Sequence, residues 1–249
     1  MVERRTGDTG MSVWDGATVL LTGGTGWFGR AFTKYALERL PIRSLRIYSR
    51  DEHKQHAMRQ VRSDTGPKAR SITYIVGDIR DKDRLTRAMY GADICVTAAA
   101  LKRVEGSSSH ARELLKTNTL GTANVIDAAL DCAVPRTIFL SSDKGLMPTN
   151  AYGKSKALAE DLMIEGNSLA GARPIRFSSV RYGNILGSTG SVLDLWRAAV
   201  VRGEPLPMTL PEMTRVFMPV QSAVELVVSV ADFMQGGEIF CPEMPRARL

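Results

Sequence analysis

Residues 17–29, ATVLLTGGTGWFG, hold the pattern from which the fold class follows. The apolar run Ala17–Thr22 is typical of a strand that is buried on both faces of a parallel sheet. Gly23, Gly26 and Gly29 follow at GxxGxxG spacing, and a helix is expected directly behind them. Glycines permit a tight turn and let backbone N–H groups approach a pyrophosphate at a helix N-terminus. This strand, turn and helix therefore predict a dinucleotide-binding site.

Similar apolar runs recur along the chain, with helical stretches between them. This alternation with short connections predicts an α/β fold with a doubly wound parallel Rossmann sheet, in which ligands bind at the carboxyl ends of the strands. The further expected strands are Leu45–Tyr48, Ile72–Val76, Ile94–Ala98, Thr137–Leu140 and Ile175–Tyr182, with short ones near Val216 and Ile239. The expected helices are Phe28–Leu40, Asp83–Met89, Ala111–Cys132, Ser191–Val201 and Gln221–Phe233.

The sequence predicts three parts. Residues 1–16 mix charge, Gly and Ser without periodicity, so we expect a flexible lead-in there. Residues 17–182 form the expected NAD(P)-binding Rossmann domain with the catalytic residues. The pattern becomes less regular in residues 183–249, which we expect to form a small substrate-binding part.

Composition narrows the function classes. The chain has 249 residues, of which 44% are hydrophobic and 24% charged, as in an average globular protein. It shows no apolar run long enough to span a membrane and no secretory signal, so we expect a cytoplasmic protein without a membrane partner. The net charge of +7 comes without a nucleic-acid-binding motif, so we expect a phosphate-bearing small molecule and no nucleic acid. The three cysteines and three histidines show no ligand spacing, so no metal site is expected.

The end of the second expected strand bears on the choice of cofactor. An enzyme that uses NAD commonly has an acid there for the ribose hydroxyls, whereas IYSRDE has Ser49 and Arg50. Arg50 can pair with a 2′-phosphate, and Lys54 follows one helical turn later, so NADP is favoured and NAD stays possible. The alternative is a solvated surface Arg50. Asp78, after the third strand, is either an acceptor for the adenine amino group or a helix cap.

A catalytic pattern follows the fifth expected strand. Ser142, Asp143 and Lys144 stand at its carboxyl end, and Tyr152 and Lys156 open the next helix at positions i and i+4. This spacing puts the phenol and the ammonium on one helix face. A cation next to a Tyr favours the phenolate, so we expect Lys156 to lower the pKa of Tyr152 from its usual value of about 10.

Taken together, these stretches resemble the extended short-chain dehydrogenase/reductases, and most closely the inverting UDP-N-acetylglucosamine 4,6-dehydratases of bacterial sugar pathways. The Asp143–Lys144 pair after the strand-end serine is the most discriminating element, because retaining dehydratases have Asp-Glu there and simple epimerases lack both residues. The matching stretches are TGGTGWFG, IYSRDE, GDIRD, AAALKRV, KTN, SSDKG, YGKSKALAE, VRYGNILGSTGS and MTR, between residues 22 and 215.

The resemblance implies a sugar dehydratase, a lyase that leaves no net redox change. Tyr152 would take a proton from a sugar hydroxyl while its carbon gives hydride to the nicotinamide, and Lys156 would hold the nicotinamide ribose. Ser142 would bind the oxidised oxygen. Lys144 would then remove the proton beside the new ketone, and Asp143 would protonate the departing hydroxyl group, so that water leaves by β-elimination.

The resemblance also implies roles for residues elsewhere in the chain. Asn118 would position water and backbone, and Lys102 and Asn184 would line the sugar pocket. Each of these three residues has an alternative reading as an ordinary helix or loop residue. The implied cofactor contacts are Thr22, Gly23, Gly26, Trp27, Phe28, Gly29, Ser49, Arg50, Lys54, Asp78, Ile79, Ala98, Ala99, Ala100, Tyr152 and Lys156.

The sequence also departs from the resembled family. Its substrate part is short, and Thr189 stands where relatives typically have Arg, so the expected substrate is a sugar nucleotide or a smaller nucleoside-like sugar. One alternative is an NADP-dependent epimerase or reductase, which gives no reason for Asp143 and Lys144. Another is a non-catalytic cofactor-sensing protein. The long helix Ala111–Cys132 favours a homo-oligomer built on a helix pair.

Overall fold

The computed structural model describes residues 12–62, 72–102, 108–188, 192–208, 210 and 212–248. Its main body is a seven-stranded sheet in the order β3-β2-β1-β4-β5-β6-β9, in which all neighbouring strands run parallel. The predicted doubly wound Rossmann sheet is therefore confirmed. The strands of this sheet are β1 (Thr18–Thr22), β2 (Ser44–Ser49), β3 (Ile72–Val76), β4 (Ile94–Thr97), β5 (Arg136–Leu140), β6 (Arg176–Val180) and β9 (Ile239–Phe240).

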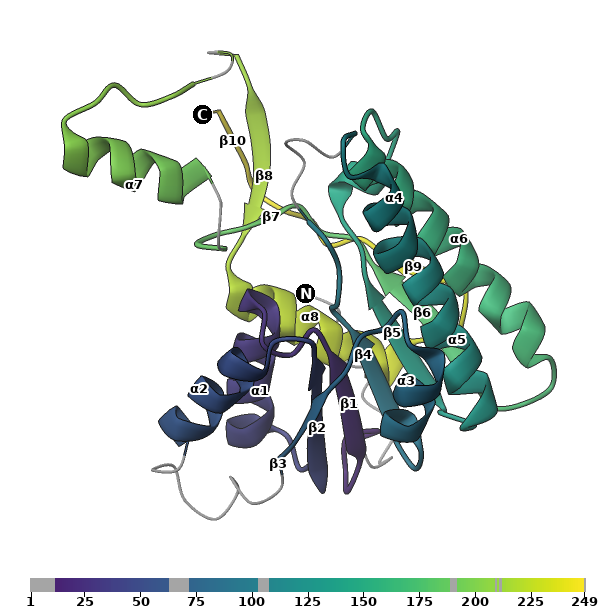
Figure 1. The fold of residues 1–249 in the computed structure, drawn as a ribbon. Helices are drawn as coiled ribbons and strands as arrows, with labels where there is room; N and C mark the ends of the chain where they lie inside the picture. The colour runs from purple at the N-terminus through teal and green to yellow at the C-terminus, as the bar shows by residue number, and fades with distance from the viewer. Residues whose placement is uncertain are drawn as a thin grey trace, which may run out of the picture.

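Helices cover both faces of this sheet (Figure 1). The helices on one face are α1 (Trp27–Arg39), α2 (Glu52–Arg62) and α8 (Val220–Phe233). The helices on the other are α3 (Lys82–Met89), α4 (Ala111–Leu114), α5 (Gly121–Asp131) and α6 (Ala151–Ala170). Successive strand residues serve opposite faces, as the strand period requires, so Val19 and Leu21 join one core and Leu20 the other.

The long helix expected over Ala111–Cys132 is interrupted. A π-helical turn, Leu115–Leu120, separates α4 from α5 and contains Asn118. Single π-turns inside α-helices are rare and occur often at functional sites. This turn lies next to α6, the helix that carries Tyr152 and Lys156, with Asn118 bonded to Ser155 of that helix.

A small lobe stands apart from the main sheet. It contains a three-stranded sheet in the order β10-β8-β7, with β10 (Arg246–Arg248) antiparallel and β7 (Asn184–Ile185) parallel to β8 (Thr214–Met218). Helix α7 (Val192–Arg202) projects beside this sheet (Figure 1). Apolar side chains on it are exposed, among them Leu195 and Val201.

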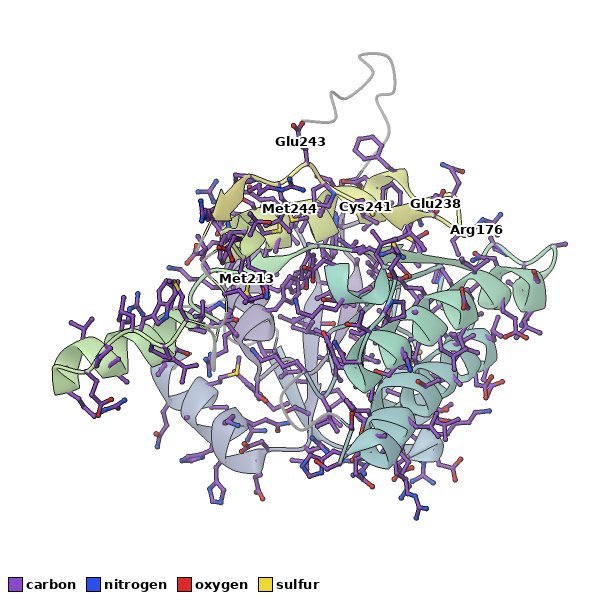
Figure 2. The ribbon with its side chains drawn as sticks, turned by 90° about the horizontal axis from the view of Figure 1, so that it is seen from above. Arg176, Met213, Glu238, Cys241, Glu243 and Met244 are labelled. Carbon is purple, nitrogen blue, oxygen red and sulfur yellow. The ribbon has the colours of Figure 1, made fainter. Side chains whose placement is uncertain are left out.

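The structure redraws the expected domain boundaries. Residues 183–249 do not form one separate part, because α8 packs against α1 and β9 pairs with β6 in the main sheet. The C-terminal segment then runs along one side of the molecule through Cys241 and Met244 (Figure 2), where the Gly183 N–H lies 3.1 Å from the Met244 sulfur. Only the segments around α7 and the three-stranded sheet make up the lobe.

The prediction of a flexible lead-in is wrong for residues 12–16. Trp14 is 1% exposed, lies against Phe32 with ring centroids 6.0 Å apart, and donates its indole N–H to Val228 O at 3.2 Å. Burial of a large aromatic ring fixes this segment against α1 and α8. Residues 1–11 lie outside the described part of the chain. Within that part, no helix is long and apolar enough to cross a membrane.

Candidate active site

The glycine turn joins β1 to α1 at the carboxyl end of the sheet. Gly23 has a φ of +66°, and a Cβ there would lie 2.7 Å from the backbone of Ala99, so only glycine lets β1 and the segment after β4 come this close. The N-cap of α1 is Gly26, which has no side-chain cap, and the first helical turn contains no acid. The first N–H groups of α1 and its dipole therefore suit a pyrophosphate.

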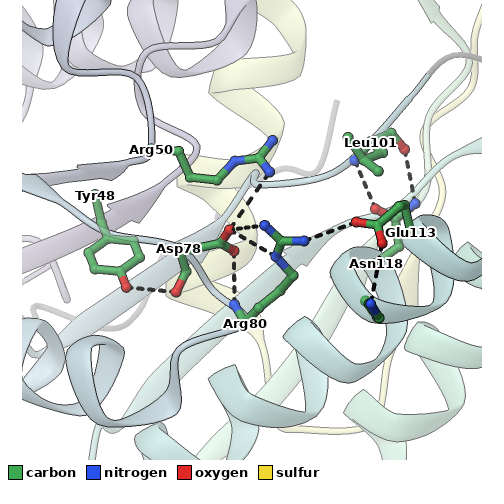
Figure 3. A network of polar contacts seen from close by, with 8 residues as sticks. Tyr48, Arg50, Asp78, Arg80, Leu101, Glu113 and Asn118 are labelled. Atoms are coloured by element: carbon green, nitrogen blue, oxygen red, sulfur yellow. Dashed lines mark hydrogen bonds and ion pairs between the residues drawn. The ribbon is translucent and has the colours of Figure 1, made fainter.

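Arg50 and Asp78, which the sequence predicts to contact the cofactor, lie close together at the ends of β2 and β3. Ser49 is buried, with its hydroxyl accepting from Gln55 Nε2 at 2.9 Å, whereas the Arg50 side chain is 53% exposed. Arg50 Nη1 lies 3.7 Å from Asp78 Oδ2 (Figure 3). Lys54 on α2 is the second cation that the sequence predicts at the cofactor site. Its Nζ lies 2.7 Å from Oδ2 of Asp51, the residue before the helix, and both side chains are exposed.

Tyr152 and Lys156 lie close to the carboxyl end of β5, next to Leu140 and Ser142. Helix α6 begins after Asn150, whose side chain caps the helix by accepting from the Gly153 N–H at 2.9 Å. Tyr152 is 7% exposed and Lys156 3% exposed. Lys156 Nζ donates to Leu140 O at 2.5 Å and lies 4.1 Å from the centre of the Phe139 ring. The helix thus presents both side chains to the carboxyl end of β5.

Burial controls the protonation of this pair. It raises the pKa of Tyr152 to about 12, an effect that the hydrogen bond with Ser142 opposes and the Asp143 charge strengthens. It lowers the pKa of Lys156 to about 7 against the attraction of the Glu160 carboxylate. The expectation that Lys156 lowers the pKa of Tyr152 is wrong for this structure, because the Lys156 ammonium is directed to a backbone carbonyl and desolvation of the phenolate dominates.

The Ser-Asp-Lys segment forms a tight 3₁₀ turn, Asp143–Gly145, directly after β5. Ser142 Oγ and Lys144 Nζ both donate to Asp143 Oδ1, each at 2.9 Å. Lys144 Nζ also lies 3.4 Å from Asn184 Oδ1 on β7. The Asp143 and Lys144 side chains are each 30% exposed. The turn therefore offers a carboxylate and an ammonium in direct contact, both partly exposed.

Asn118 is a buried connector between three elements. Its amide accepts from the Leu101 N–H at 2.8 Å, and donates to Leu101 O at 2.9 Å and to Ser155 Oγ at 3.0 Å. It therefore fixes the backbone after β4 against α6. Lys102 is exposed beside that fixed backbone. Thr189 lies outside the described residues.

The remaining predicted cofactor residues lie around the glycine turn and the ends of β1, β3 and β4. Thr22 is fully buried, and its hydroxyl accepts from the Ala99 N–H at 3.3 Å. Trp27 is 36% exposed, and a Cβ on Gly187 would lie 3.3 Å from its ring. The loop after β7 therefore approaches the glycine turn. Phe28 and Ile79 are buried, Gly29 is buried in α1, and Ala98 and Ala100 are half-buried.

The sequence patterns do not single out three residues that the structure places at the site. Tyr182 is 7% exposed, and burial together with the neighbouring Tyr152 raises its pKa. Glu160, four residues after Lys156 on α6, is 2% exposed and forms an ion pair with Arg181, which donates Nε at 3.0 Å. The i, i+4 spacing of Lys156 and Glu160 is a usable signal. The Arg181 partner depends on the pairing of β5 with β6 and has no local signal.

The glycine turn and the Tyr152–Lys156 helix on a parallel sheet place the chain in the extended short-chain dehydrogenase/reductase class. The family described as polysaccharide biosynthesis protein matches residues 19–249, and the chain belongs to this family.

Named relatives include both dehydratases and epimerases. The inverting UDP-N-acetylglucosamine 4,6-dehydratase of Campylobacter jejuni is 39% identical over 238 residues, which are 95% of this chain and 70% of the relative. A UDP-glucose 4-epimerase of Rickettsia rickettsii is 37% identical over 235 residues, 93% of this chain and 67% of the relative. The X-ray structure of Pen from Bacillus thuringiensis is similar with a TM-score of 0.90 at 33% identity, covering 95% of this chain and 73% of that one. The resemblance seen in the motifs is confirmed.

Proposed function

We propose that the protein is an NADP-dependent dehydratase of a sugar nucleotide, a lyase that oxidises a sugar hydroxyl transiently and eliminates water. The observation that carries this proposal is the turn after β5, where Lys144 Nζ lies 2.9 Å from Asp143 Oδ1. The oxidation and the reduction use Tyr152, Lys156 and Ser142 with a bound nicotinamide, and give no role to Asp143 and Lys144. An acid and a base in contact beside these residues supply what an elimination requires in addition.

The described residues fit a nicotinamide dinucleotide. The uncapped N-terminus of α1 suits the pyrophosphate, and Arg50 suits a 2′-phosphate. Asp78 would accept from the adenine amino group, and Lys156 would hold the nicotinamide ribose. When bound, the nicotinamide supplies hydride transfer to and from the sugar carbon.

Tyr152 and Ser142 serve the oxidation. The Tyr152 phenolate accepts the proton of the sugar hydroxyl as its carbon is oxidised, and Ser142 Oγ holds the oxygen that becomes the ketone. Since burial raises the pKa of Tyr152 to about 12, this step accelerates as pH rises. Asn118 supports the step by fixing the backbone of Leu101 against α6.

Asp143 and Lys144 serve the elimination. Passage of one proton along their hydrogen bond converts the ion pair into a neutral amine and a carboxylic acid. The amine removes the proton from the carbon beside the ketone, and the acid protonates the hydroxyl group that leaves one carbon further on. One C–H bond and one C–O bond break, a C=C bond forms, and water departs. Asn184 holds the Lys144 ammonium from the other side, and Lys102 and Asn184 are proposed to contact the sugar.

The substrate class rests on relatives that act on UDP-linked sugars. A 4-epimerase is the second candidate, which the 37% identity to the Rickettsia enzyme favours. NMR spectroscopy of the protein with NADP and UDP-N-acetylglucosamine or UDP-glucose separates the two. We expect a dehydrated sugar nucleotide without lasting accumulation of reduced cofactor. A C4 epimer as the sole product would replace the dehydratase proposal with an epimerase. Separate titrations of the protein with UDP and with uridine test whether binding requires the diphosphate.

We also propose a homo-oligomer. Half-exposed apolar side chains stand on neighbouring helical segments of one sheet face, namely Leu115 and Leu120 on the π-turn and Leu158 and Leu169 on α6. Apolar side chains gathered in this way favour a helix-pair interface. Analytical ultracentrifugation of the protein and of Leu120→Glu tests it, and a monomer at micromolar concentration would refute it.

A further inference from the structure

Asp78 stands between two arginines at the ends of β2 and β3. Figure 3 shows the guanidinium groups of Arg50 and Arg80 both directed at the Asp78 carboxylate, with Glu113 of α4 beyond Arg80. Lys116 lies 3.4 Å from Glu113 and continues this row of alternating charges. The row leads from the cofactor-side Arg50 to the helix after β4.

The two arginines do not share the carboxylate equally. Arg80 donates Nε at 2.8 Å and Nη2 at 2.6 Å to Asp78 Oδ2, and its backbone N–H to Oδ1 at 3.0 Å. Arg50 Nη1 stays at 3.7 Å from Oδ2, beyond hydrogen-bond distance. Glu113 accepts from Arg80 Nη1 at 3.0 Å, and Tyr48 donates its hydroxyl to Asp78 O at 2.8 Å. Side chain and backbone of Asp78 are thus both fixed.

We propose that Arg80 is a positioning residue for cofactor choice: by pairing with the Asp78 carboxylate it keeps Arg50 available for a 2′-phosphate. The inference rests on the proposed use of NADP. It does not require Arg80 to touch the cofactor, since its effect passes through Asp78.

Neutralisation of the Asp78 charge by Arg80 affects the binding of a 2′-phosphate in two ways. An uncompensated Asp78 carboxylate would attract the Arg50 guanidinium, the group that is proposed to bind the phosphate. The same carboxylate would also repel a 2′-phosphate electrostatically. The charge state is consistent with this role: burial alone would raise the pKa of Asp78, but the hydrogen bonds and charge of Arg80 outweigh it and hold that pKa below its usual range.

Equilibrium binding of NADP and NAD to the whole chain tests the inference. The quantity measured is the ratio of the two dissociation constants, because general damage to the site changes both constants alike. We expect Arg80→Met to lower the preference for NADP by about fivefold, the upper range for exposed ion pairs. Arg84→Met is the matched control, since Arg84 is an exposed arginine of α3 that donates to Val76 O at 3.1 Å and does not touch Asp78.

A rescue variant separates this role from a structural one. In the double variant Arg80→Met with Asp78→Asn, the side chain at position 78 carries no charge that captures Arg50, so the NADP preference should return toward that of the wild type. An unchanged ratio in Arg80→Met, with a wild type that prefers NADP, overturns this inference alone. A loss that the second substitution does not restore also overturns it. A wild type that binds NAD as tightly as NADP overturns the cofactor proposal as well.

Discussion

Gly153, in the first turn of α6, packs against the turn that contains Asp143 and Lys144, and its replacement tests whether the spacing between this helix and the turn matters. A Cβ at Gly153 would overlap Lys144 O, and its next neighbour, Pro148 Cβ, lies at 3.0 Å. Backbone atoms must therefore move by about 1 Å to restore ordinary contact distances. A displacement of about 1 Å between catalytic groups costs about a hundredfold in rate. We expect Gly153→Ala to lower kcat for dehydration by about this factor.

The control for this prediction is Gly145, the glycine of the Asp143–Gly145 turn. A Cβ at Gly145 would meet its nearest neighbour, Ala157 N, at 3.5 Å, which is an ordinary contact. Gly145→Ala should therefore retain kcat within about threefold of the wild type. The assay is product formation by NMR at saturating substrate, with circular dichroism and urea unfolding to verify that both variants fold. A folded Gly153→Ala variant with wild-type kcat would refute the proposed coupling between the helix and the turn.

Three further predictions concern stability and cofactor binding. Since burial lowers the pKa of Lys156 to about 7, the unfolded chain binds more protons than the folded one between about pH 7 and pH 10, so stability rises with pH there. Lys156→Met should remove this rise, and at pH 6 its free energy of unfolding in urea should exceed that of the wild type by about 2 kcal/mol. A free energy of unfolding with the same pH dependence as the wild type would contradict this prediction. Trp14→Ala should cost about 3–5 kcal/mol of unfolding free energy, and a loss below about 1 kcal/mol would show that residues 12–16 are not part of the core. Arg50→Ala should weaken NADP binding by about tenfold and leave NAD binding within about twofold, as calorimetry can measure; equal losses would rule out a phosphate contact.

Local patterns suffice for much of this fold. The strands around Val19, Ile47, Ile94 and Ile138 are short apolar runs between turns, and parallel strands covered on both faces leave this signature whatever their partners. The placement of β9 is different. Two residues, Ile239–Phe240, join the sheet only because β6 offers a free edge, and no local periodicity contains that information.

The candidate site shows the same division between local and long-range information. The i, i+4 spacing by itself places Tyr152 and Lys156 on one helix face, because helical geometry alone determines which side chains are neighbours. Their pKa values depend on burial at the end of β5 and on the direction of the Lys156 ammonium, which tertiary packing sets. The pairing of Arg80 with Asp78 likewise depends on side-chain positions that spacing leaves open.

The elimination chemistry assigned to the turn after β5 is tested by hydrogen exchange in D₂O with UDP-N-acetylglucosamine. The wild type should incorporate solvent deuterium at the carbon beside the transient ketone. Lys144→Ala should still oxidise the sugar, seen as transient reduction of the cofactor, yet incorporate no deuterium at that carbon and release no water. Deuterium incorporation by Lys144→Ala at the wild-type rate would contradict the assignment of Lys144 as the base.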